Sequence, residues 1–299
     1  MIEKRSIALG TGVSLDVAVG GPEEGEPIIF LHGFPESHRT WRHQLADLSR
    51  DHFVIAPDQR GYAGSDKPPE IEEYATDKIV ADVFALADEL GIDRFTLVGH
   101  DWGGAAAWLA ALTDQARVKR LVIVNAPHPL VFARSLAKDG AQRAASQYVR
   151  AFRDPRMEQR IGEMGLGAFY EKNFGRHADL SKIPDEERTA YITDWSRPGA
   201  LTAMLNWYRA SKMEVPAVGE AAEAPAWTQA EFPKLMMPVL VIWGLQDQAL
   251  LPEQLDGLDA LIGDLRIVTS ATGGHFIPWE EPEIVNSAIR DFVVESAKA

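Results

Sequence analysis

The sequence predicts an α/β fold with a mostly parallel, doubly wound sheet and an inserted helical segment. Short, continuous apolar runs recur along the chain, and amphipathic stretches of helical period lie between several of them. Runs of this kind suit strands that are buried on both faces of a parallel sheet. Their alternation with helices is typical of doubly wound α/β proteins, which is the fold class we expect.

The expected elements begin with a β-hairpin over residues 5–19, where side-chain character alternates around a Gly-Thr-Gly turn. An amphipathic helix is expected over residues 75–90, where apolar side chains recur at helical spacing. Six apolar runs mark the core strands, and these are residues 28–31, 53–56, 95–98, 121–124, 239–242 and 265–268.

The alternation of strands and helices stops near Pro127 and resumes near Met237. The residues between show helical periodicity and few strand runs, so we expect a helical lid inserted between two consecutive core strands. The expected organisation is a first part of the core over residues 1–128, a lid over residues 129–232 and a second part of the core over residues 233–299.

Composition and charge narrow the possible partners. The chain has 299 residues, with 30 Lys and Arg against 44 Asp and Glu, and a net charge of −14. This balance argues against nucleic acid or an anionic membrane as a partner. Cysteine is absent, which excludes disulfides and thiolate metal sites. No signal peptide or membrane span is evident, so we expect a cytoplasmic protein. The oligomeric state does not follow from the sequence.

Residues 98–104 (VGHDWGG) predict a strand, a sharp turn and a helix, with small residues around the central Asp101. This is the nucleophile elbow pattern. The small residues are needed because the central residue sits in a strained turn and the helix packs close to the strand. In most such elbows the central residue is serine, and here it is aspartate.

A carboxylate at this position changes which reactions are possible. Asp101 is expected to be ionised at neutral pH, since the unperturbed pKa of an aspartate is about 3.9. Its attack on an ester or amide would give a mixed anhydride, whereas its attack on a saturated carbon gives an ordinary alkyl ester. We therefore expect an alkyl electrophile, such as an epoxide or an alkyl halide. Water must then hydrolyse the ester, and that step needs a base.

Two further residues complete a triad in the chain order nucleophile, acid, histidine. Asp247 and His275 each follow an expected parallel strand, at the edge where the active sites of α/β sheets lie. We expect His275 to be the general base and Asp247 to orient it and balance its charge. Taken singly, Asp247 could be a helix cap and His275 a buried structural histidine. Asn125 occupies the other plausible acid position, but it is neutral and cannot replace Asp247.

The backbone N–H groups of Phe34 and Trp102 are the candidate oxyanion hole, because both follow core strands at the same edge. We expect no metal site, because His38 and His43 lack the spacing of metal ligands. Other polar residues in these motifs are assigned structural roles: hydrogen bonding for His32 and His100, and bracing of the loop over the site for Asp58 and Arg60.

Together, residues 32–36 (HGFPE), 58–62 (DQRGY), 99–104 (GHDWGG), 243–247 (WGLQD) and 274–275 (GH) resemble the α/β-hydrolase-fold epoxide hydrolases. The resemblance covers essentially the whole core. It implies an α/β-hydrolase fold and an enzyme without a cofactor. It also implies that an epoxide and water are converted to a vicinal diol through an ester on the nucleophile.

The resemblance extends into the expected lid at Tyr148 and Tyr208. Both look like the paired lid tyrosines of the family, which hold and protonate the epoxide oxygen. Tyr208 could alternatively be a core aromatic, because it shares one helix face with Leu201 and Leu205. Ala63 departs from the glycine that the family usually has there.

Two other functions remain open. A dehalogenase of the same fold would also suit Trp102 beside the nucleophile. However, Phe34 offers no side-chain N–H, and Trp102 and Ala105 lack the arginines of haloacid-type relatives. Opening an epoxide creates an alkoxide that needs a proton, which a tyrosine can deliver, whereas a halide needs none. A non-catalytic ligand receptor is the second alternative, and the intact triad argues against it.

Overall fold

The computed structural model describes residues 1–296, and its core is one eight-stranded sheet with the order β1-β2-β4-β3-β5-β6-β7-β8. The expected hairpin is present as β1 (Glu3–Ala8) and β2 (Ser14–Gly20), which pair antiparallel. Strand β2 also pairs antiparallel with β4, and all later neighbours are parallel. The mostly parallel sheet confirms the predicted α/β fold.

Every apolar run that predicted a core strand lies in one. The strands are β3 (Glu26–Leu31), β4 (His52–Pro57), β5 (Phe95–His100), β6 (Val118–Val124), β7 (Leu235–Gly244) and β8 (Ile262–Ser270). Strands β4 and β5 are buried along their whole length, as a strand covered on both faces should be. Strand β8 is instead partly exposed, because it forms the edge of the sheet and has only β7 beside it.

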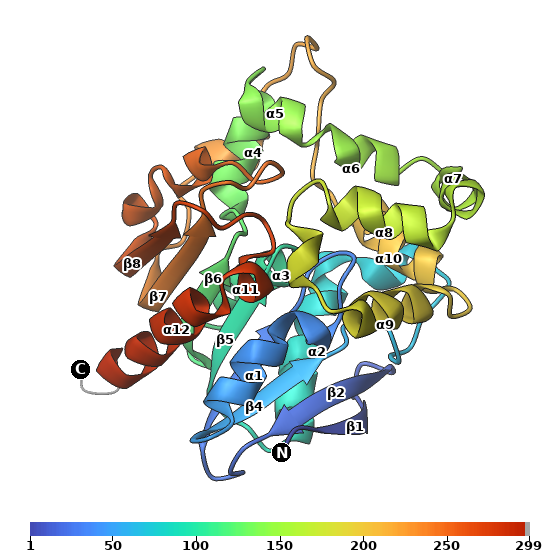
Figure 1. The fold of residues 1–299 in the computed structure, drawn as a ribbon. Coiled ribbons are helices and arrows are strands. Elements are labelled where there is room, and N and C mark those ends of the chain that lie inside the picture. The colour runs from blue at the N-terminus through green and yellow to red at the C-terminus, as the bar shows by residue number, and fades with distance from the viewer. Residues whose placement is uncertain (297–299) are drawn as a thin grey trace.

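Helices cover both faces of the sheet (Figure 1). Alternate strand side chains point to opposite faces, so Leu97 packs with α2 (Thr76–Glu89) and α3 (Trp102–Thr113) in one apolar cluster. Its neighbour Val98 belongs to the second cluster, with α1 (Arg42–Leu48) and α12 (Pro282–Ser296). Helix α2 confirms the helix expected over residues 75–90.

The chain between β6 and β7 is mainly helical. It contains α4 (Pro129–Ala137), α5 (Ala141–Ala145), α6 (Gln147–Phe152), α7 (Met157–Met164), α8 (Leu166–Phe174), α9 (Asp185–Trp195) and α10 (Ala200–Ala210). Figure 1 shows α5, α6, α7 and α8 above the sheet and above α1 and α2. The last helix before the C-terminal one is the short α11 (Ile277–Glu280).

Short 3₁₀ turns complete the elements: η1 (His38–Trp41), η2 (Ile71–Tyr74), η3 (Leu180–Lys182), η4 (Ala226–Gln229), η5 (Pro252–Leu255) and η6 (Leu258–Ala260). Two buried indoles fasten the helical segment to loops of the core. Trp195 donates a hydrogen bond to the carbonyl of Pro35 at 2.8 Å, and Trp207 donates one to the carbonyl of Arg60 at 3.0 Å.

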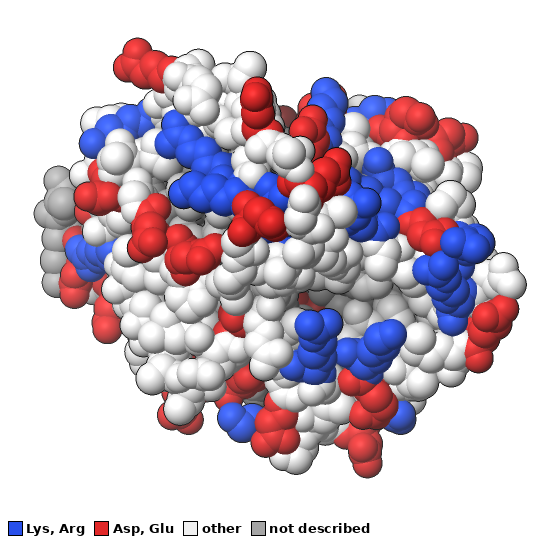
Figure 2. Space-filling view, turned by 90° about the horizontal axis from the view of Figure 1, so that it is seen from above, with Lys and Arg blue, Asp and Glu red and all other residues white. Residues whose placement is uncertain are grey.

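Seen from above, the molecule carries acidic and basic side chains interspersed around a hollow (Figure 2). Charges of both signs are therefore mixed on this face, although the chain as a whole is acidic. Within residues 1–296, no helix combines the length and the apolar character that crossing a membrane requires.

Candidate active site

Asp101 occupies a strained turn between β5 and α3, with φ of 50° and ψ of −120°. A positive φ is uncommon for a residue that carries a Cβ atom, and it is held here by close packing on both sides. A Cβ on Gly103 would lie 2.2 Å from the carbonyl oxygen of Leu31. The start of α3 therefore approaches β3 as closely as the small residues of the elbow motif suggest.

The two carboxylate oxygens of Asp101 have different neighbours. The backbone N–H of Phe34 donates to Oδ1 at 2.8 Å. A Cβ on Gly33 would lie 2.6 Å from the same oxygen, so this approach requires glycine at position 33. The N–H of Trp102 belongs to the first turn of α3, where the helix itself supplies no acceptor. Oδ2 is instead 3.6 Å from Nε2 of His275, an ion-pair distance.

Asp247 holds His275 from the other side. Nδ1 of His275 donates to Oδ2 of Asp247 at 2.7 Å. The N–H groups of Ala249 and Leu250 donate to Oδ1 at 2.8 and 2.9 Å. With a proton on Nδ1, the imidazole directs Nε2 towards Asp101, which is the orientation that a general base at this position needs. The structure therefore brings the three expected triad residues together.

Asn125 has a role that the sequence reasoning missed. Its Nδ2 donates to Oδ2 of Asp247 at 2.7 Å, and its Oδ1 accepts the N–H of Gly244 at 2.8 Å. The available signal was topological: Asn125 follows β6 and Asp247 follows the adjacent β7, so both lie at the same edge of the sheet. Asn125 therefore helps to hold the carboxylate of Asp247 in place.

Charges of opposite sign stabilise one another in this buried site. Burial alone would raise the pKa of Asp101 and of Asp247, but His275 and the N–H donors lower both below their ordinary value. Burial would likewise lower the pKa of His275, but the two carboxylates raise it well above 6.5. The free site therefore favours two carboxylates with an imidazolium between them.

The other polar residues of the motifs are hydrogen-bonded within the core. His100 lies 2.7 Å from the carbonyl of His275 and 3.0 Å from Glu36, and His32 accepts the N–H of Gln59. Asp58 accepts two hydrogen bonds from His38, and Arg60 donates two to Asp82. Within residues 1–296, no group of three or more His, Asp or Glu side chains is arranged to hold a metal ion.

Tyr148 of α6 and Tyr208 of α10 line the same two cavities as Asp101. Their ring centroids are 6.2 Å apart, and the ring of Tyr208 also packs edge-on against Phe34 and Trp102. Burial and the charge of Asp101 raise the pKa of both tyrosines above 10, so both phenols keep their protons. Tyr208 is thus both a packed aromatic and a residue of the cavity wall.

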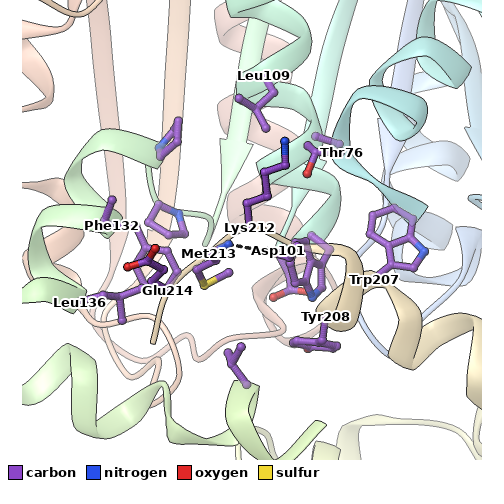
Figure 3. Close-up of a pocket in the computed structure, with 18 of the residues that line it drawn as sticks. Thr76, Asp101, Leu109, Phe132, Leu136, Trp207, Tyr208, Lys212, Met213 and Glu214 are labelled. Carbon is purple, nitrogen blue, oxygen red and sulfur yellow. Dashed lines mark hydrogen bonds between the residues drawn. The ribbon is translucent and has the colours of Figure 1, made fainter. Parts of the chain in front are cut away.

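Two cavities meet at these three residues. Asp101, Tyr148 and Tyr208 line a cavity of about 350 Å³ and also a second of about 260 Å³. Figure 3 shows the first, with Asp101 and Tyr208 at one side and Phe132 and Leu136 at the other. His275 lines the second cavity and not the first. A molecule bound at Asp101 can therefore extend in two directions.

Comparison with known proteins identifies the family of this chain. Residues 26–282 match the model of the alpha/beta hydrolase fold family. The chain is 33% identical to the AB hydrolase superfamily protein YfhM of Bacillus subtilis, over 94% of this chain and 95% of that protein. It is 30% identical to epoxide hydrolase 4 of Mus musculus, over 94% of this chain and 76% of the mouse protein.

A solved structure described as a novel epoxide hydrolase of the alpha/beta hydrolase superfamily, from metagenomes of hot environments, superposes with a TM-score of 0.91. It is 48% identical to this chain, and the match covers 98% of this chain and 99% of the other. These likenesses confirm the resemblance that the motifs indicate. The chain belongs to the α/β-hydrolase fold family, and within that family to the epoxide hydrolases.

Proposed function

We propose that this protein hydrolyses a small-molecule epoxide to a vicinal diol, with Asp101 as the nucleophile. The observation that carries the proposal is the shared cavity wall, where an ionised carboxylate at a nucleophile elbow lies beside two protonated phenols. The carboxylate can attack carbon, and the phenols can protonate the oxygen that the attack releases.

In the first step, Oδ2 of Asp101 attacks one carbon of the epoxide ring. The Phe34 N–H holds Oδ1, which leaves Oδ2 as the oxygen available for bond formation. The C–O bond of the ring breaks, and its electron pair moves to the epoxide oxygen. Tyr148 and Tyr208 donate hydrogen bonds to this oxygen, and one of them transfers a proton to it. The products of this step are an alkyl ester on Asp101, a free hydroxyl group and a tyrosinate. The tyrosinate regains its proton from the imidazolium of His275, which leaves a neutral imidazole for the second step.

In the second step, water hydrolyses the ester. His275, now a neutral imidazole, takes a proton from the water, and Asp247 balances the charge of the resulting imidazolium. The water oxygen bonds to Cγ of Asp101, and the N–H groups of Phe34 and Trp102 stabilise the oxyanion that forms on Oδ1. Collapse of this intermediate breaks the bond between Cγ and Oδ2, and the alkoxide that leaves takes a proton relayed by His275. The diol is released, and the carboxylate of Asp101 and the imidazolium of His275 are restored.

Residues 129–232 act as the lid of this site and supply both tyrosines. The two cavities that meet at Asp101 accept substituents on either side of the epoxide. The walls of the larger cavity are mostly apolar, including Leu109, Phe132 and Leu136, so we expect it to take the apolar substituent.

A single turnover in ¹⁸O-labelled water tests the mechanism. Because the water attacks Cγ, the label should appear in the side chain of Asp101, and mass spectrometry of the digested protein detects it. Label found only in the diol after the first turnover would show direct attack by water on the epoxide and would contradict the proposal.

A panel of epoxides and alkyl halides distinguishes the proposed function from its alternatives. We expect diol formation from epoxides, with much less halide released from haloalkanes. Halide release without diol would identify a dehalogenase. Binding with no turnover of either substrate class would identify a ligand receptor.

A further inference from the structure

Glu280, the last residue of α11, folds back over the loop that carries His275. Its Oε1 accepts the N–H of Phe276 at 2.8 Å, and its Oε2 accepts the N–H of Gly274 at 3.3 Å. One carboxylate thus holds the backbone on both sides of His275. The adjacent Glu281 points elsewhere, because it accepts hydrogen bonds from the hydroxyl groups of Ser270 and Thr272.

The lid closes on the same loop from the other direction. A Cβ on Gly274 would lie 2.6 Å from the carbonyl oxygen of His177 and 3.1 Å from both carboxylate oxygens of Glu280. The ring of His177 is 5.9 Å from that of His275. Gly274 therefore lies between the lid and the carboxylate, which leaves this part of the loop little room to move.

The carboxylate of Glu280 also acts on His275 through its charge. Burial raises the pKa of Glu280 to about 7, while the two N–H donors and the charge of His275 favour its ionised form. The charged and titratable groups around it are His275 on the loop, His177 and Lys182 from the lid, and Glu281 beside it. An imidazolium at His275 and a carboxylate at Glu280 therefore stabilise each other.

This charge gains importance after the first step of the proposed reaction. In the free site, His275 lies between the carboxylates of Asp101 and Asp247. Ester formation removes the negative charge of Asp101. The imidazolium that forms during hydrolysis is then hydrogen-bonded to one carboxylate, that of Asp247. Glu280 supplies a second negative charge nearby, in place of the charge that Asp101 has lost.

We infer that Glu280 is a positioning residue for ester hydrolysis, which clamps the loop around His275 and stabilises its protonated form once Asp101 is esterified. The inference rests on the proposed function, because it assigns Glu280 to the second step alone. Glu280 does not line either cavity at Asp101, so it acts through His275 and does not touch the substrate.

The test compares Glu280→Gln with the matched control Glu281→Gln in the full-length enzyme. Rapid quenching and intact-protein mass spectrometry measure the formation and the hydrolysis of the alkyl-enzyme separately, with styrene oxide as the probe. We expect Glu280→Gln to slow hydrolysis by roughly tenfold, as for the loss of one charge-assisted interaction, and to leave ester formation within about twofold of wild type. Glu281→Gln should leave both rates unchanged.

The pH profile supplies the decisive measurement. Without the charge of Glu280, the imidazole of His275 loses its proton more readily, so the acid limb of the hydrolysis rate should move to lower pH in Glu280→Gln. A merely structural defect would lower the rate and leave the limb in place. The inference would therefore be overturned if the acid limb of the hydrolysis rate did not move in Glu280→Gln. It would also be overturned if the substitution slowed ester formation and ester hydrolysis equally.

Glu280→Asp keeps the test decisive if the glutamine variant does not fold. The shorter carboxylate keeps the charge but cannot reach both N–H groups, so we expect slower hydrolysis with the acid limb near its wild-type position. Wild-type rates of ester hydrolysis in Glu280→Asp would show that holding both N–H groups is not needed, and would overturn this part of the inference. Failure of the proposed function is distinct from either result, because wild-type enzyme would then form no alkyl-enzyme at all.

Discussion

The edge of the sheet and the proposed lid, residues 129–232, hold their candidate catalytic side chains in opposite ways. At the sheet edge, Asp247 is surrounded by hydrogen-bond donors that keep its carboxylate ionised, and this carboxylate in turn orients His275. In the lid, Tyr148 and Tyr208 are packed among aromatic rings, and burial keeps their phenols protonated.

The difference suggests that the sheet edge stabilises charged groups and that the lid stabilises neutral, proton-donating groups. Backbone N–H groups and a neighbouring amide stabilise charge, whereas apolar packing stabilises the neutral form of an acid. In the proposed mechanism, the sheet edge supplies the nucleophile and the base, and the lid supplies the proton. Substitution of the base at the sheet edge should therefore affect hydrolysis of the ester, whereas substitution of the tyrosines should affect its formation.

The largest effect is expected at Asp101, where both steps depend on one carboxylate. Asp101→Ala should lower turnover by about 10⁴-fold or more, because no ester can form. The measurement is diol release with a sensitive chromatographic assay. Asp101→Asn is a less certain control, since water activated by His275 could hydrolyse the amide slowly back to aspartate. Substantial diol formation by the alanine variant would show that Asp101 is not the nucleophile.

His275→Gln should separate the two steps. Asp101 needs no base for its attack, so the variant should form the ester and then fail to hydrolyse it. We expect a burst of about one equivalent of substrate consumed per enzyme, followed by near-arrest. Intact-protein mass spectrometry should show the corresponding adduct. A folded variant that forms no ester would place His275 in the first step and would contradict the assignment.

The lid tyrosines should affect the first step. Tyr148→Phe and Tyr208→Phe should each slow ester formation by roughly tenfold to a thousandfold, the range for one lost transition-state hydrogen bond. The double variant should lose far more than either single variant, because each tyrosine can partly replace the other. Single-turnover rates with an epoxide provide the measurement. Near-wild-type epoxide turnover by the double variant would show that the two tyrosines only pack and do not donate to the substrate. It would then favour the dehalogenase function over the epoxide hydrolase function.

The pH dependence of stability should reveal the charged state of the sheet edge. The pKa of His275 is raised in the fold, so its contribution is complete below the unfolded value of about 6.5 and is lost as the pH rises through the raised pKa. Urea unfolding should therefore show the largest stability difference between wild type and His275→Gln between about pH 4.5 and 6.5. A difference that grows at higher pH would contradict a protonated His275.

The smallest effect is expected where the lid is fastened to the core. Trp195→Phe removes the hydrogen bond to Pro35 and should lower the free energy of unfolding by about 1–3 kcal/mol, because a buried carbonyl loses its donor. The KM should rise, while the rate of ester hydrolysis should not change. Trp227 is 47% exposed, and Trp227→Phe should change stability by less than about 0.5 kcal/mol. Equal destabilisation by Trp195→Phe and Trp227→Phe would show that the hydrogen bond from Trp195 to Pro35 does not fasten this segment to the core.

The sequence by itself determined the strands and the elbow, because their signals are local. Apolar runs, the small residues around Asp101 and the positions of Asp247 and His275 after strands can all be read within a few residues. The parallel arrangement then places the strand ends at one edge, since parallel strands end on the same side of the sheet. That reasoning brings the triad residues to one place without any coordinates.

Only the tertiary structure decided what surrounds those residues. Strand β8 is partly exposed because it lies at the edge of the sheet, and an apolar run does not encode its place in the strand order. Asn125 meets Asp247, and Tyr148 meets Tyr208, across long stretches of sequence. The two cavities and the contact of the lid with the His275 loop likewise depend on segments distant in the chain. Such contacts are set by how whole elements pack, whereas a motif records only the neighbours along the backbone.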